Sequence, residues 1–186
     1  MLAHLLDGLM QSLWNETQTS PLEANYWSCV PYLLGEDQAM MYSFRTRLAT
    51  RSRIPGLPFR APDNYLRDNM VATLDRQDAA FDLMVQLQTD PFRMPIENAA
   101  VRWPEKLSPF RPVAVLHLPR QKFDSPAQFD FAKRLSYNPW HALPEHRPLG
   151  NQSRARRRMY WELSQLRQRM NDTPHYEPTG DETFDS

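Results

Sequence analysis

The sequence predicts an α+β fold: a partial antiparallel β-barrel with long proline-rich loops and C-terminal helices. Three segments are typical of strands and four of helices, and they do not alternate regularly along the chain, which favours antiparallel pairing. Seventeen prolines against five glycines in 186 residues predict long, ordered connections rather than flexible linkers. Three strands do not close a barrel, so the sheet should form only part of one.

The N-terminal third of the chain should contain one helix and one strand. Apolar residues recur at helical spacing over 1–14, which predicts an amphipathic helix. After a proline-punctuated connection, residues 38–47 are typical of a strand with one apolar face, made by Met40, Tyr42 and Phe44. Three prolines and a glycine make 51–64 a loop.

The remainder should contain three helices and two further strands. A helix is predicted over 65–77, after a capping Asn or Asp. Strict apolar–polar alternation over 81–88 predicts a half-buried strand, and 112–118 reads as a strand that ends at a proline. A short helix should cover 126–136, and a compact proline turn should lead into a basic helix over 151–172.

The composition excludes several classes of protein. Lys+Arg and Asp+Glu number 22 each, so no overall field attracts nucleic acid or an anionic membrane. No apolar run approaches the roughly 18 residues that span a membrane. The single cysteine, Cys29, excludes an internal disulfide framework and a cysteine-built metal site. The start lacks the features of a signal peptide, so a cytoplasmic location is expected.

The chain is expected to form one folded unit followed by a tail. Residues 1–172 carry all the predicted elements. Residues 173–186 have no apolar period and carry acidic charge, which predicts a disordered acidic tail.

The basic helix places its arginines in two sets. Six of the sixteen residues from 154 to 169 are arginine, and one tyrosine lies among them. At 100° per residue, Arg156, Tyr160 and Arg167 share one face, with Leu163 between them. The other arginines, Arg154, Arg157, Arg158 and Arg169, lie off that face. Binding of a polyanion would not require this sorting.

A tyrosine beside arginines has a specific chemical use. A guanidinium one turn away favours the ionised phenol, and a trivalent metal favours it further. Tyrosinate is one of the proximal ligands of haem iron. Two alternatives remain open: a packed tyrosine ring with a solvated arginine rim, and a basic helix that binds RNA or anionic lipid.

Three extended stretches resemble catalase-related haem proteins, in the same order along the chain. They are "YWSCVPYLLGEDQAMMYSFRTR" at 26–47, "FDLMVQLQTDPFRMPIENAAVRWPEKLSPFRPVAVLHLPRQKF" at 81–123 and "SYNPWHALPEHRPLGNQSRARRRMY" at 136–160. The likeness is to the short catalase-like branch of the family, over its C-terminal, haem-proximal half. It implies that the sheet is the second half of a catalase-like barrel.

The resemblance also implies roles for three residues. Tyr160 matches the tyrosinate that binds the ferric haem iron, so it is the expected metal ligand. Arg156 matches the catalytic arginine that pairs with the ligand oxygen, and Arg167 resembles the arginine near a haem propionate. The implied activity is that of a haem oxidoreductase, of the catalase or peroxidase type, acting on hydrogen peroxide or organic peroxides.

The chain departs from the family in lacking the distal half. Family members carry a distal histidine and asparagine well before the stretch at 26–47, and His4 has no surroundings like theirs. A distal base moves the proton between peroxide oxygens, so this chain alone is expected to be weakly active or inactive. The alternative function is a truncated, non-catalytic haem-binding or association module. The unpaired edges of half a barrel predict a homo-oligomer or a missing N-terminal half as partner.

Overall fold

The computed structural model describes residues 18–49, 51–55 and 61–184. The helix predicted over 1–14 lies outside the described residues. The described part is a mixed α+β structure, as the sequence predicts.

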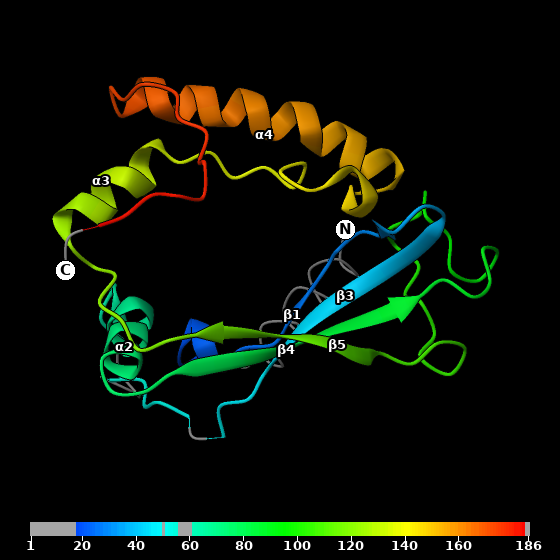
Figure 1. The fold of residues 1–186 in the computed structure, drawn as a ribbon, viewed down its shortest axis with the longest axis horizontal. Helices are drawn as coiled ribbons and strands as arrows, with labels where there is room; N and C mark the ends of the chain where they lie inside the picture. Colours follow the sequence, from blue (N-terminus) through cyan, green and yellow to red (C-terminus); the bar gives the residue numbers. More distant parts are fainter. Residues whose placement is uncertain (1–17, 50, 56–60, 185–186) are drawn as a thin grey trace, which may run out of the picture.

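The sheet has five antiparallel strands in the order β1-β3-β4-β5, with β2 paired to the same strand, β3, as β1. The three predicted strands are confirmed, and two short ones were not predicted. The sheet is not closed, so a complete barrel is not formed by the described residues (Figure 1). The strands are β1 (Tyr26–Trp27), β2 (Tyr32–Leu34), β3 (Gln38–Thr46), β4 (Ala79–Leu87) and β5 (Arg111–Leu118).

Two apolar clusters hold the sheet to the helix and the loops that pack on it. At one end, Phe81 of β4 packs with Leu22 and with Leu74, the last residue of helix α2 (Tyr65–Leu74). At the other end, Met94 and Trp103 from the loop after β4 pack on Ala39 of β3. Alternate residues of each strand face opposite sides, so the polar–apolar alternation in the sequence supplies both clusters.

Strand β5 is an exposed edge. Seven of its eight residues are exposed, including Val113 at 55%, Val115 at 49% and Leu116 at 43%. It pairs with β4 on one side only, so a row of its backbone N–H and C=O groups has no sheet partner among the described residues. The half-barrel expected from the sequence therefore has an open, apolar edge.

Helices α3 (Pro126–Arg134) and α4 (Gly150–Met170) confirm the two C-terminal helix predictions. Helix α3 begins with a capping box, in which Ser125 and Gln128 satisfy each other's backbone N–H groups. Among the described helices, none has the length and apolar character needed to cross a bilayer.

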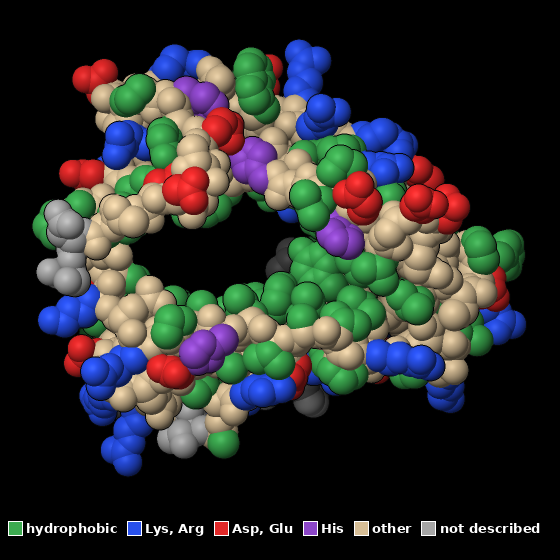
Figure 2. Space-filling view, viewed as in Figure 1, with side chains coloured by type: hydrophobic (Ala, Val, Ile, Leu, Met, Phe, Trp, Pro, Cys, Tyr) green, Lys and Arg blue, Asp and Glu red, His purple; other side chains and the backbone are tan. Residues whose placement is uncertain are grey.

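The start of α4 is fixed to the loop after β4. The Glu97 carboxylate accepts hydrogen bonds from the Asn151 backbone N–H at 2.7 Å and from both terminal nitrogens of Arg154 at 3.1 and 3.0 Å. Gly150 is buried and its φ is +86°, a left-handed value that favours glycine. From this point α4 runs opposite the sheet (Figure 1). Figure 2 shows an opening between α4 and the sheet, with apolar side chains along it.

The Glu97 contacts predict a pH-dependent stability. The Arg154 guanidinium and the Asn151 N–H hold the pKa of Glu97 below its usual value of 4.5. A carboxyl group whose pKa is lowered by folding stabilises the fold above its unfolded pKa, and this contribution is lost as the pH falls. In Glu97→Gln, the thermal midpoint should therefore lie below that of the wild type at pH 7, and the difference should vanish as the pH falls below 4.5.

The control for this variant is Glu105→Gln, which removes an exposed ion pair to Arg102 in the same loop. Scanning calorimetry from pH 7 to pH 3 measures both variants. A difference for Glu97→Gln that is equally large at pH 3 and pH 7 would contradict the expectation.

Candidate functional site

The face of α4 that the sequence singles out is the half-buried one. Arg156, Tyr160 and Arg167 are all partly buried. The arginines off that face, Arg154, Arg157, Arg158 and Arg169, are exposed. The helix therefore keeps two of its six arginines beside the tyrosine and exposes the other four.

Arg156 and Tyr160 contact each other directly. The Arg156 Nη2 donates a hydrogen bond to the Tyr160 hydroxyl oxygen at 2.9 Å, and the guanidinium carbon lies 5.1 Å from the centre of the ring. This hydrogen bond raises the pKa of Arg156, so the guanidinium keeps its charge. A charged donor aimed at a phenol oxygen stabilises negative charge on that oxygen.

A pair of tyrosines comes from the sheet. Tyr32 of β2 and Tyr42 of β3 pack edge to face, with ring centres 5.0 Å apart. Burial, then the hydrogen bond with Tyr42, raises the pKa of Tyr32 well above its usual value, so Tyr32 stays a neutral phenol. Backbone hydrogen bonds from Leu33 to Arg147 at 2.9 Å and from Leu149 to Pro31 at 2.8 Å hold β2 against the segment that leads into α4.

Arg167 joins the site from the next turns of α4. Its Nη2 donates to the backbone oxygen of Leu135, and its guanidinium carbon lies 5.9 Å from the centre of the Tyr137 ring. Its Nε is buried and has no hydrogen-bond partner among the described residues. A buried, unpaired N–H is a donor that an incoming carboxylate could satisfy.

Tyr160 lines two neighbouring cavities. One, of about 530 Å³, is an open hollow lined by the end of α3, the residues that follow it and the C-terminal segment. The other, of about 220 Å³, is shared by Tyr160, Tyr137, Leu163 and Arg167. Tyr160 and Arg167 therefore line the smaller cavity together, whereas Arg156 lines neither cavity and joins the site through its hydrogen bond to Tyr160.

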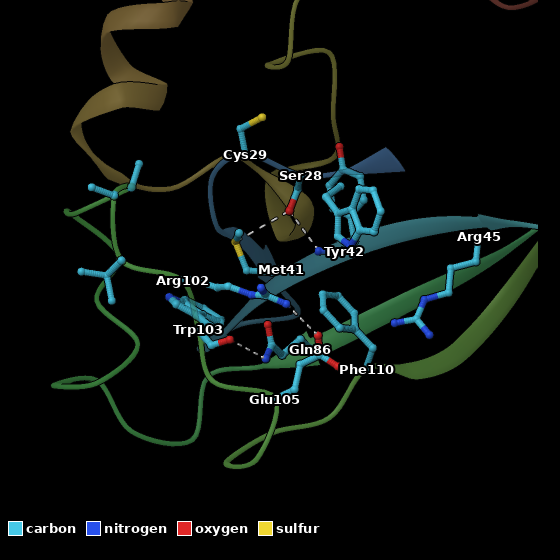
Figure 3. Close-up of a pocket in the computed structure, with 14 residues that line it drawn as sticks. Ser28, Cys29, Met41, Tyr42, Arg45, Gln86, Arg102, Trp103, Glu105 and Phe110 are labelled. Carbon is cyan, nitrogen blue, oxygen red and sulfur yellow. Dashed lines mark hydrogen bonds and ion pairs between the residues drawn. The ribbon is translucent and has the colours of Figure 1, made fainter. Parts of the chain in front are cut away.

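A further cavity, of about 470 Å³, lies between β3 and the loop after β4 (Figure 3). Gln86 donates to the backbone oxygens of Trp103 at 3.3 Å and Ser108 at 2.8 Å, which holds this loop on the sheet. Two of the charged groups that line this cavity already pair with each other, since Arg102 contacts Glu105 at 3.4 Å. The Tyr160 cavities offer the less satisfied polar groups, so they form the candidate site.

Comparison with known proteins identifies the fold. No family model matches the sequence, and no curated protein is similar to it. Among solved structures, a bacterial catalase matches with a TM-score of 0.66 over 91% of this chain, at 15% identity. A fungal catalase matches at 0.65 over 81%, also at 15% identity, and catalase A from Saccharomyces cerevisiae at 0.63 over 81%, at 13% identity.

The fold is catalase-like. The match covers 38% of the bacterial catalase, 32% of the fungal one and 33% of the yeast one, so this chain spans about a third of their length. The expected catalase-like architecture is confirmed at the level of the fold. Within the described residues, no group of three or more His, Cys, Asp or Glu side chains could hold a metal ion.

Sequence reasoning found the helix residues of this site but missed their neighbours. Tyr32 belongs to a strand of three residues, which is too short to show a period, and Tyr42 was predicted on the apolar face of its strand but not at the site. Tyr137 precedes a proline turn and was noted only as part of it. The density of aromatic residues around 26–44 is the signal that could have indicated a second wall of the site.

Proposed function

We propose that this chain is the haem-proximal part of a catalase-related oxidoreductase that acts on hydrogen peroxide or organic peroxides. Tyr160 is the ligand of ferric haem iron, Arg156 is the catalytic arginine that keeps the ligand oxygen negative, and Arg167 receives a propionate. The observation that carries the proposal is the 2.9 Å hydrogen bond from Arg156 to the Tyr160 oxygen on a half-buried, cavity-lining face.

The residues present fit a haem. A haem iron that takes one protein ligand needs a single donor atom, so the absence of a larger cluster of metal-binding side chains among the described residues does not conflict with it. The phenol oxygen accepts a hydrogen bond from the charged Arg156 guanidinium, so the proposed ligand atom has a cationic partner beside it. The unpaired Nε of Arg167 suits a carboxylate, which a planar guanidinium binds well.

Each residue has a distinct task in the proposed function. Ferric haem, when bound, supplies the redox centre for reaction with peroxide. Tyr160 would hold the iron through its phenol oxygen. Arg156 would keep negative charge on that oxygen, and the half-buried Tyr32 stays a neutral phenol. Arg167 would hold a propionate of the haem.

The test of the proposal is a titration of the purified chain with haemin, followed by absorbance. The wild type should bind one haem and give the ferric spectrum of a tyrosinate ligand. Arg156→Gln removes the charge that stabilises the phenolate, so its haem affinity should fall about tenfold, which corresponds to about 1.4 kcal/mol.

Arg158→Gln is the matched control, because Arg158 is exposed and only contacts Glu162 at 3.8 Å, one turn away. It should bind haem as the wild type does. An equal loss in both variants would mean that total helix charge, rather than the Tyr160 contact, attracts the haem. A folded wild-type chain that takes up no haem would refute the proposed function.

The alternative, a non-catalytic association module, is favoured by one observation, the exposed edge of β5. In both proposed functions, β5 can pair with a second copy of the chain or with the remainder of a longer catalase-like chain. They differ in the haem titration, since an association module without a haem site would keep the fold and show no tyrosinate spectrum.

A further inference from the structure

The C-terminal segment lies beside the Tyr160 cavity. Residues 173–184, here named the strap, leave the end of α4 and return alongside α3 (Figure 1). Pro178 and Glu182 of the strap line the same 530 Å³ cavity that Tyr160 lines. The strap is thus one wall of the candidate site, and the proposed function assigns it no task.

We propose that the strap is a movable wall of the Tyr160 cavity, held in place by Glu177 between two histidines. The claim that the strap controls the access of haem or peroxide rests on the proposed function. The claim that the strap docks beside Tyr160 and opens there is independent of the proposed function, so the two claims can be tested separately.

Aromatic contacts anchor the strap on α3. The ring of Tyr176 packs edge to face on Phe131 with centres 5.6 Å apart, and Phe184 packs on the same ring at 5.1 Å. Tyr176 also forms an isolated parallel bridge with Leu135, and the Arg134 guanidinium lies 5.8 Å from its ring centre. Such contacts fix where the strap lies, because edge-to-face aromatic pairs stabilise a contact beyond the area that they bury.

Glu177 joins the strap to the walls of the cavity. One carboxylate oxygen, Oε2, lies 2.9 Å from Nε2 of His141, which also lines the cavity. The other, Oε1, lies 3.0 Å from Nε2 of His175. All three side chains are 38–46% exposed, so these contacts are weak enough to break without unfolding the chain.

The second nitrogen of His175 joins the strap to α4. Its Nδ1 lies 2.8 Å from Oε1 of Gln168 on α4. The amide nitrogen of Gln168 donates to the Arg134 backbone oxygen at 2.8 Å, so Gln168 also joins α4 to the end of α3. The ring of His175 thus bridges Glu177 of the strap and Gln168 of α4.

Glu182 also fixes the strap within itself. Hydrogen bonds from the Tyr176 hydroxyl and from the Thr179 N–H lower its pKa to about 2, so it is ionised at neutral pH. The strap thus has two carboxylates with partners, Glu177 between the histidines and Glu182 within the strap.

Hydrogen exchange of the full chain without haem measures the docking. In Glu177→Gln, amide exchange of the peptide covering the strap should be about threefold to fivefold faster than in the wild type at pH 6, after correction for intrinsic rates. Glu162→Gln, which removes an exposed α4 carboxylate paired with Arg158, is the matched control and should leave strap exchange unchanged.

Hydroxyl-radical footprinting at pH 6 measures how far the strap shields Tyr160, through the oxidation of its ring. This oxidation should rise about threefold in Glu177→Gln, in step with strap exchange. Unchanged exchange, or faster exchange with unchanged Tyr160 oxidation, would overturn the proposal. If both change as expected in a chain that takes up no haem, the strap stands and the proposed function fails.

Discussion

Tyr160→Phe is expected to abolish the tyrosinate-type ferric spectrum and to weaken haem binding on the order of a hundredfold, or about 2.8 kcal/mol. The substitution removes one oxygen atom and keeps the ring. Only the ligand atom and the acceptor for Arg156 are lost, since the described contacts of the Tyr160 hydroxyl consist of that one 2.9 Å hydrogen bond. The effect should exceed that of Arg156→Gln, because the arginine acts through the oxygen whereas the oxygen is the proposed ligand atom.

The control is Tyr65→Phe, a tyrosine of α2 whose hydroxyl donates to the Gln18 backbone oxygen far from α4. Haem titration and absorbance spectra measure both variants, and circular dichroism compares their folds. Tyr65→Phe should keep the wild-type spectrum. A spectrum that survives Tyr160→Phe would remove Tyr160 as the ligand.

Gly150→Ala should lower the free energy of unfolding by about 2–5 kcal/mol. Two terms add. An L side chain rarely adopts the φ of +86° at this position, and a Cβ there would meet the Ile96 backbone oxygen at 2.6 Å. A backbone oxygen cannot turn aside as a side chain does, so the start of α4 must move away from the loop that holds it.

Gly35→Ala separates the two terms. Gly35 also has a positive φ, +73°, but nothing lies within 4 Å of the added Cβ. This control should therefore lose only the conformational term, about 1–2 kcal/mol. Urea denaturation measures both variants, and equal losses would contradict the steric argument. Because α4 carries Tyr160, Gly150→Ala should also weaken haem binding, whereas Gly35→Ala should not.

The elements with a clear period could be predicted from the sequence. Alternation over 81–88 and the spacing of residues on the basic helix each repeat often enough to specify a face, so β4 and α4 appear as expected. The same spacing brought Arg156 and Tyr160 together, because residues four apart on a helix are neighbours. The roles assigned to them, and to Arg167, stay predictions.

The parts that could not be predicted depend on contacts distant in sequence. Strands β1 and β2 have two and three residues and are defined only by their pairing with β3. The partner of Arg167 is a backbone oxygen 32 residues earlier, which no local pattern specifies. The division into a domain over 1–172 and a disordered tail over 173–186 likewise stays a prediction, with the strap contacts as its alternative.

The open edge of β5 has a consequence for how this protein behaves in a test tube. A strand with a free row of hydrogen-bonding groups gains stability from whatever chain pairs with it, and mass action makes that gain depend on concentration. Melting temperature and denaturation midpoint should then rise as the protein is concentrated, whereas those of a closed barrel would not. The stability of this molecule should therefore depend on its concentration as well as on its sequence.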